Sequence, residues 1–242
     1  MLRIAGLLLW FALCAPIHLA TKILTGRSPW PRRFLGGAAW LCGARVRTVG
    51  ESARRHTLLV PNHTSWLDIM VLAGATDCAF VSKDDLGHGL LHWLADQNAT
   101  VYVDRAHVKG ARDQAIALAK SLEGDKPVTV FAEGTTGPGI YLLPFHSTLF
   151  EAANYAAEDV VIRPVAVDYG PAKAEVGWFE ESGLANVFRI LGRRGTLPVT
   201  VHLLAPLDRS GDRKRLAAAA REAIARTLGL PSSVPSPIGG GE

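Results

Sequence analysis

The stretch that decides the fold is Asn62-His63-Thr64-Ser65-Trp66-Leu67-Asp68, which lies between two apolar runs. The run before it, residues 57–61, has the length and composition of a buried strand, and the run after it belongs to a helix predicted near residues 66–75. His63 is therefore expected in the connecting loop and Asp68 in the first helical turn, with Ser65 as the N-cap. A strand, a polar loop and a helix in this order are typical of an α/β fold.

The same alternation continues along the chain. Further strands are predicted at residues 78–82, 100–104, 127–132, 160–168 and 198–204, and further helices near residues 86–95, 108–123, 147–157 and 214–228. This pattern predicts a single α/β domain, residues 56–230, in which helices flank a largely parallel mixed sheet. His63, Arg105 and Glu133 each follow a strand, so they are expected to meet at the C-terminal edge of that sheet.

A second polar block, Phe131-Ala132-Glu133-Gly134-Thr135-Thr136, places a carboxylate beside a glycine, which lets backbone approach a ligand closely. Histidine is the side chain whose unperturbed pKa suits a general base near neutral pH, and His63 is the candidate. A carboxylate such as Asp68 on its other ring nitrogen would fix the tautomer and stabilise the imidazolium. The two blocks together indicate acyl transfer to a hydroxyl. In the alternative interpretation, Asp68 only favours the positive end of a helix and His63 is structural.

Four ordered blocks carry a resemblance to a known family. They are Asn62-His63 with Asp68, Tyr102-Val103-Asp104-Arg105, Phe131-Ala132-Glu133-Gly134-Thr135 and Val161-Ile162-Arg163-Pro164-Val165. Their order and spacing, over residues 57–170, resemble the glycerolipid (lysophospholipid) acyltransferase family, which includes the 1-acylglycerol-3-phosphate acyltransferases. The resemblance implies a single-displacement reaction in which an activated lysolipid hydroxyl attacks an acyl thioester, without an acyl-enzyme. The thioester, acyl-CoA or acyl carrier protein (acyl-ACP), is a co-substrate, and no bound cofactor is expected.

The resemblance also implies roles for individual residues. His63 would activate the acceptor hydroxyl and Asp68 would orient His63. Glu133, Gly134 and Thr135 would shape the acceptor pocket, and backbone groups near Gly134 would help to bind the oxyanion. Arg105 would bind the head group, since a guanidinium matches phosphate geometry, and Lys83 would face the same pocket. Both cations have the alternative of simple solvent exposure. The remaining residues assigned to substrate binding are Asn62, Ser65, Thr136 and His146.

Two positions depart from the family pattern. Ala132 stands where a proline is usual, and Thr136 stands where an arginine is usual. The second change removes a positive charge and weakens the case for a phosphate-bearing acceptor. The segment 142–150, in which His146 takes a basic position, resembles a subgroup that includes lyso-ornithine lipid acyltransferases. Lysophosphatidic acid is the leading expected acceptor, with lyso-ornithine lipid or another lysophospholipid as the alternative.

The N-terminal segment, residues 1–55, is both basic and apolar. Nine Lys and Arg residues against Glu51 alone give it a charge of +8, whereas the whole chain carries +4. Apolar stretches at residues 4–24 and 34–46, with arginines and tryptophans around them, predict membrane-anchoring helices. A two-helix anchor in one leaflet, a spanning helix and a cleaved signal peptide remain open, although small residues are missing from the sites where a signal peptidase would cut. The expected location is the cytoplasmic face of the inner (plasma) membrane, where anionic lipid would be the partner.

Other features add little, and other functions remain as alternatives. Residues 231–242, rich in proline, serine and glycine, are expected to form a disordered tail. The three cysteines have no paired spacing, and no metal site or nucleic-acid partner is expected. His88 and His92 have metal-ligand spacing but lack the adjacent glutamate of a zinc protease. A serine hydrolase would need a Gly-x-Ser-x-Gly motif, which is absent from the sequence. A non-catalytic, membrane-bound interaction protein is the remaining alternative.

Overall fold

The structure is a computed structural model that describes residues 2–83, 89–103, 110–209 and 212–231. Its strands are β1 (Ala44–Val49), β2 (Thr57–Pro61), β3 (Ala79–Lys83), β4 (Val101–Val103), β5 (Val128–Thr129), β6 (Val161–Asp168) and β7 (Leu197–Leu203). Its helices are α1 (Leu2–Thr25), α2 (Trp30–Leu41), α3 (Leu67–Thr76), α4 (Leu90–Gln97), α5 (Ala111–Ser121), α6 (Lys173–Val176), α7 (Gly183–Gly192) and α8 (Arg213–Leu228), with 3-10 helices η1 (Ser147–Asn154) and η2 (Gly170–Ala172).

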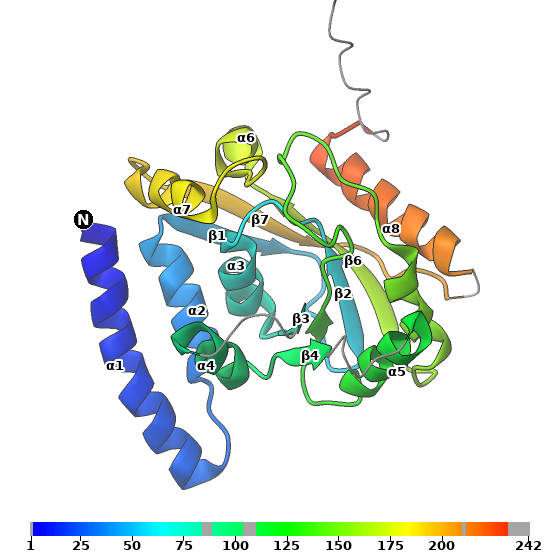
Figure 1. Ribbon diagram of the computed structural model, residues 1–242, viewed down its shortest axis with the longest axis horizontal. Helices are drawn as coiled ribbons and strands as arrows, with labels where there is room; N and C mark the ends of the chain where they lie inside the picture. Colours follow the sequence, from blue (N-terminus) through cyan, green and yellow to red (C-terminus); the bar gives the residue numbers. More distant parts are fainter. Residues whose placement is uncertain (1, 84–88, 104–109, 210–211, 232–242) are drawn as a thin grey trace, which may run out of the picture.

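The strands form one sheet in the order β1-β7-β6-β2-β5-β3-β4. Strands β6, β2, β5, β3 and β4 are parallel to their neighbours in this group, and β7 pairs antiparallel with β6. The edge strand β1 is parallel to β7. The predicted mixed, largely parallel sheet flanked by helices is therefore confirmed (Figure 1). Because β6, β2 and β5 are adjacent and parallel, their C-terminal ends lie together at one edge of the sheet.

Both faces of the sheet are covered by other elements. Successive side chains of β2 point to opposite faces, so this strand contributes to the core on each side. Leu59 packs with Leu72 of α3 in one hydrophobic core, which also includes residues of β7 and α7. Leu58 and Val60 pack on the other face, in a second core formed with α5, η1 and α8. All three β2 side chains are at most 1% exposed. A strand buried on both faces reads as a continuous apolar run, and this explains why β2 could be located from the sequence.

Several elements differ from the sequence expectations. Strand β1 falls within the segment 1–55 that was expected to form the anchor, and it completes the sheet beside β7. The run 147–157 forms the 3-10 helix η1 rather than an α-helix. Strand β5 has only two residues with sheet pairing, whereas six were expected. Helix α7 was not predicted, and its hydrogen bond to the segment that carries His63 is described below.

The two N-terminal helices lie side by side at one side of the molecule (Figure 1). Helix α1 is long and apolar enough to cross a membrane. Its 18-residue apolar stretch has a mean hydropathy of 1.9, and 11% of that stretch is buried inside the protein. Helix α2 packs on α3 through two glycines: a Cβ on Gly74 would lie 2.7 Å from the Cα of Gly36. Arg32 also donates to the carbonyl of Gly74 at 3.2 Å. The N-terminal helices are thus attached directly to the helix that contains Asp68.

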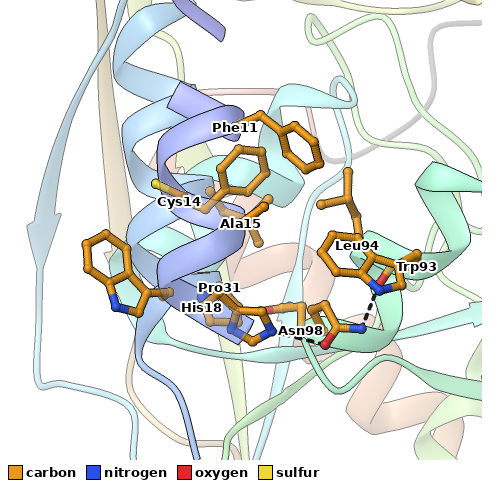
Figure 2. Close-up of a pocket in the computed structure, with 12 residues that line it drawn as sticks. Phe11, Cys14, Ala15, His18, Pro31, Trp93, Leu94 and Asn98 are labelled. Atoms are coloured by element: carbon orange, nitrogen blue, oxygen red, sulfur yellow. Dashed lines mark hydrogen bonds between the residues drawn. The ribbon is translucent and has the colours of Figure 1, made fainter. Parts of the chain in front are cut away.

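Helix α1 also contacts α4, and a small cavity of about 40 Å³ lies between them and α2 (Figure 2). Phe11 and Trp93 meet edge to face, with ring centroids 6.3 Å apart. At the polar end, the two ring nitrogens of His18 lie 2.8 Å from Ser28 Oγ and 3.0 Å from Gln97 Oε1. None of the residues assigned to catalysis or substrate binding lines this cavity. The side chains around this cavity help to hold α1 against the domain, and the cavity is separate from the candidate site.

Candidate functional site

Three adjacent parallel strands bring the main polar side chains of the site together. His63 follows β2, Glu133 follows β5, and Tyr169 follows β6. Hydrogen bonds connect the three segments: Glu133 accepts from the backbone of His63, and Tyr169 donates to Asp68. The histidine and glutamate blocks thus meet at the C-terminal edge of the sheet, as predicted.

The carboxylate of Asp68 lies beside the imidazole of His63. Oδ2 of Asp68 is 3.0 Å from Nδ1 of His63, and the aspartate side chain is fully buried. The same oxygen accepts from the backbone N–H groups of Thr64 and Ser65, at 2.6 and 2.9 Å. Two backbone donors on a carboxylate stabilise its charged form inside the protein. The spacing of five residues therefore works because the loop wraps around the carboxylate.

The structure corrects one detail of the helix start. Helix α3 begins at Leu67, so the capping position is Trp66, whose side chain makes no cap hydrogen bond. Ser65 lies one residue earlier, where its Oγ accepts from the N–H of Leu67 at 3.3 Å. Ser65 is also completely buried, which places its hydroxyl out of reach of a substrate and argues against a serine nucleophile. The N–H groups of Thr64 and Ser65 are thus satisfied by Asp68, and that of Leu67 by Ser65 Oγ.

The imidazole of His63 is held flat against a ring. It stacks on Phe131 with centroids 3.8 Å apart and an interplanar angle of 18°, and 15% of the side chain is exposed. Since the Asp68 carboxylate accepts at Nδ1, the proton of the neutral imidazole is on Nδ1 and the lone pair is on Nε2. His63 is thus oriented by two contacts, with Nε2 as the nitrogen that can take a proton from a bound molecule.

Tyr169 is a part of the site that sequence reasoning missed. Its hydroxyl donates to Oδ1 of Asp68 at 2.5 Å, and its side chain is 1% exposed. Burial and the Asp68 charge raise the pKa of the tyrosine well above its usual value, so the hydroxyl stays protonated and remains a donor. The available signal was its position directly after the long apolar strand β6, parallel to β2. Asp68 is therefore held on both oxygens.

Glu133 joins two loops through its carboxylate. Oε1 accepts from the N–H of His63 at 2.7 Å, and Oε2 accepts from the N–H of Leu143 at 2.8 Å. The side chain is 4% exposed, and burial raises its pKa to about 7, against the opposing effect of the two backbone donors. It was expected to shape an acceptor pocket. In the structure both oxygens bind backbone, so its direct effect is to position the His63 loop.

The turn after Glu133 lies beside His146. Gly134 has φ +72°, and a Cβ there would be 3.0 Å from the imidazole of His146, so glycine suits both the backbone and the contact. The N–H of Gly134 itself donates to Phe131 O at 3.1 Å, and a role of other backbone groups near Gly134 in binding the oxyanion stays a prediction. Thr135 is exposed and Thr136 is half-buried in the same turn. One residue further, Gly137 N donates to His63 O at 2.7 Å.

Asn62 fastens the end of β2 to β6. Its Oδ1 accepts from the N–H of Val167 at 2.8 Å, and its Nδ2 donates to Val167 O at 3.2 Å. Nδ2 is also 3.2 Å from Thr64 Oγ1, and the side chain is 3% exposed. These bonds satisfy a buried amide and fix the residue that precedes His63. Asn62 was assigned to substrate binding, and in the structure its side chain is engaged within the protein.

Of the two cations expected in the site, Lys83 and Arg105, the structure describes the position of Lys83 alone. Lys83 is the last residue of β3, two strands away from β2 with β5 between them. Arg105 lies outside the described residues, as does His88. Within the described residues, no group of three or more His, Cys, Asp or Glu side chains is arranged to hold a metal ion. The cysteines at 14, 42 and 78 are buried, and burial raises their thiol pKa values, to about 11 for Cys42.

The raised pKa of Glu133 predicts a pH-dependent contribution to stability. Because the pKa is about 7 in the folded protein and near 4.5 when the carboxyl is solvated, the native state holds the proton more tightly. The stabilisation that the Glu133 carboxyl group contributes is fully present below pH 4.5 and is lost as the pH rises through 7. The melting temperature of the wild type relative to Glu133→Gln should therefore fall between pH 5 and pH 8. Glu158→Gln, at an exposed carboxyl, is the control, and a difference that stays constant or rises with pH would contradict the assignment.

Comparisons with known proteins agree with this geometry. The Acyltransferase family model matches residues 45–168, which span β1 to the end of β6. The chain is 32% identical to the lyso-ornithine lipid O-acyltransferase of Rhodobacter capsulatus, over 89% of this chain and 85% of the relative. It is 34% identical to the enzyme of the same name from Pseudomonas aeruginosa, over 78% and 76%. It is 31% identical to the 1-acyl-sn-glycerol-3-phosphate acyltransferase of Neisseria gonorrhoeae, over 47% and 46%.

The fold also has a solved counterpart. The crystal structure of the 1-acyl-sn-glycerophosphate acyltransferase of Thermotoga maritima superposes with a TM-score of 0.62, at 21% identity, over 95% of this chain and 97% of that one. At this identity the likeness concerns the fold alone. The family model and the relatives of similar length carry the assignment of the reaction class. The chain belongs to the acyltransferase family and is an acyltransferase.

Proposed function

We propose that this protein transfers a fatty acyl group from an acyl thioester to the free hydroxyl of a lysolipid at a membrane surface. The observation that carries the proposal is the contact between the buried Asp68 carboxylate and Nδ1 of His63, 3.0 Å apart, at the C-terminal edge of the sheet. This contact leaves Nε2 as a base in a partly exposed position. A general base of this kind suits attack by an alcohol, whose own pKa is far above neutral pH.

The proposed reaction is a single displacement. Nε2 of His63 takes the proton of the acceptor hydroxyl while the hydroxyl oxygen attacks the thioester carbonyl. The tetrahedral intermediate then collapses, the C–S bond breaks, and the departing thiolate takes the proton from the imidazolium. The charge of Asp68 stabilises the imidazolium during this sequence. General base catalysis of this type contributes about 100- to 10,000-fold to a rate.

As the acceptor we propose lyso-ornithine lipid, ahead of lysophosphatidic acid. Thr136 stands where a phosphate-directed arginine is usual in the family, and the relatives with the longer coverage carry the lyso-ornithine name. An ornithine head group presents a carboxylate and an ammonium instead of a phosphate, so it needs one cation fewer. Lysophosphatidic acid remains the second candidate, because the relative from Neisseria gonorrhoeae is named for that acceptor. Either acyl-CoA or acyl-ACP fits the same chemistry as donor.

Thiol release provides the test. Detergent-solubilised protein would be assayed with acyl-CoA and acyl-ACP against lyso-ornithine lipid, lysophosphatidic acid and other lysophospholipids, with product identified by mass spectrometry. We expect release that requires an acceptor, with lyso-ornithine lipid giving the highest kcat/KM. His63→Ala should lose at least about 100-fold, since it removes the base.

The control is His202→Ala, a half-buried histidine on β7, which is separated from β2 by β6. It should retain activity close to that of the wild type. Equal activity of His63→Ala and wild type would remove His63 from the mechanism. A folded wild type that releases no thiol with any acceptor would favour the non-catalytic interaction protein, and release that needs no acceptor would favour a hydrolase. Preference for lysophosphatidic acid would reverse the proposed order of acceptors.

Tyr169 should act through Asp68 rather than through the substrate. Its hydroxyl bonds the buried carboxylate, and a hydrogen bond to a charged group contributes about 1.5–3 kcal/mol. Tyr169→Phe should therefore lower kcat by about tenfold, with KM little changed, because only the orientation and charge of Asp68 are affected. Tyr155→Phe, at a position that is 39% exposed and outside the site, is the matched control. An unchanged kcat, or an effect confined to KM, would contradict a positioning role for Tyr169.

A further inference from the structure

Helix α7 has two faces of opposite character. On its inner face, Asn186 and Ile190 are at most 2% exposed, whereas on its outer face Leu184 is 71% and Phe188 is 63% exposed. Residues 184 and 188 are one turn apart, as are 186 and 190, so the faces follow from the helical repeat. Two large apolar side chains facing solvent on one helix are unusual for a surface element. The outer face of α7 is therefore a candidate docking surface.

The inner face of α7 is fastened to the loop that holds the catalytic histidine. Oδ1 of Asn186 accepts from Nε1 of Trp66 at 2.9 Å, two residues before Asp68. Nδ2 of Asn186 donates to Gly177 O at 3.2 Å and to Glu181 Oε1 at 2.8 Å. Nearby, the N–H of Trp178 donates to Thr64 O at 2.9 Å. Whatever binds the outer face of α7 is thus separated from the His63 loop by one layer of protein.

The C-terminal end of α7 is attached to the start of α1. Arg3, in the first turn of α1, donates to Ile190 O at 2.9 Å and to Gly195 O at 2.7 Å. Its neighbour Leu2 is 91% exposed, and on the next turns of α1 Leu8 is 66% and Leu9 is 73% exposed. Figure 1 shows the N-terminal end of α1 near α7, at the same side of the molecule. The exposed apolar side chains of the two helices therefore belong to neighbouring elements.

The C-terminal end of α7 carries the charge that suits an anionic surface. The segment 183–195 contains three arginines and no acidic residue. Arg189 and Arg193 pair with Glu181 and Glu175. The exposed Glu180 lies before the start of the helix, and the exposed Arg194 lies just beyond its C-terminal end. An amphipathic helix with exposed leucine and phenylalanine beside basic residues is the pattern that binds the interface of anionic membranes.

We propose that the α7 docking surface, formed by Leu184, Phe188 and Arg194 on a helix that neighbours the start of α1, binds an anionic lipid surface. This contact holds the His63 loop at the membrane, so that an acceptor can enter the site without leaving the lipid layer. The second part rests on the proposed function, since it requires the acceptor to be a lipid. A single membrane-bound helix leaves the domain free to rotate about the axis of that helix, and α7 supplies a second point of attachment that restricts this rotation.

The first experiment measures the depth of α7 directly. Phe188→Trp would be mixed with vesicles of phosphatidylcholine, with and without phosphatidylglycerol, containing lipids brominated on the acyl chain. The fluorescence added by the new tryptophan should be quenched, and more strongly with phosphatidylglycerol. Ile116→Trp, at an exposed position on α5, is the control and should not be quenched. Co-sedimentation alone would not serve, because α1 can retain the protein on vesicles by itself.

The second experiment separates docking from chemistry. The double variant Leu184→Ser and Phe188→Ser should lose at least about tenfold in activity toward an acceptor embedded in phosphatidylcholine–phosphatidylglycerol vesicles, since two large apolar side chains no longer enter the lipid. Toward the same acceptor in detergent micelles it should match the wild type. Ile116→Ser should be unchanged in both assays.

An unquenched tryptophan at position 188, or full activity of the double variant on vesicles, would overturn the proposal. A change in oligomeric state of the double variant, seen by light scattering, would overturn it as well, because it would mark α7 as an interface between copies of the chain. If the wild type transfers no acyl group even in micelles, the proposed function fails, while the quenching result still decides whether α7 meets the lipid.

Discussion

The buried carboxylate of Asp68 is the constraint on which the site depends. A charge fully removed from water is stable only when its oxygens are bonded, and this one accepts from two backbone N–H groups, an imidazole and a tyrosine hydroxyl. The donors come from the loop after β2 and from the residue after β6. Satisfying one carboxylate therefore fixes the loop, the helix start and the imidazole at the same time. The base is oriented by the fold rather than by the substrate.

Glu133 extends this arrangement to a third strand. Its oxygens hold the N–H groups of His63 and Leu143, so the histidine loop and the segment after the glycine turn move together. Two buried carboxylates thus have different tasks: Asp68 acts on the imidazole, and Glu133 acts on the backbone that carries it. Helix α7 connects to the same loop from outside through Asn186 and Trp66. The His63 loop, the turn after Glu133 and the proposed membrane contact are therefore connected by hydrogen bonds.

The sequence predicted the features with a strong local signal. Strand β2, continuously apolar, has the bounds that were expected. The positions of His63 and Glu133 directly after predicted strands led to the correct sheet edge. The place of Tyr169 directly after β6 puts it at the same sheet edge, but this signal does not reveal its partner, Asp68, 101 residues earlier. The role of Glu133 depends on long-range backbone bonds, which residue type alone does not reveal. Helix α7 was missed because its 10 residues begin with glycine and lack a long periodic pattern.

The central claim is that Asp68 serves catalysis through His63. A double-mutant cycle on kcat/KM tests it most directly, with wild type, His63→Ala, Asp68→Asn and the double variant assayed under one set of conditions. If Asp68 acts only by orienting the imidazole and stabilising its protonated form, its replacement has no further effect once His63 is gone. The double variant then has the same kcat/KM as His63→Ala. If the two losses multiply instead, Asp68 has an independent task, and the arrangement of base and orienting carboxylate described above is wrong.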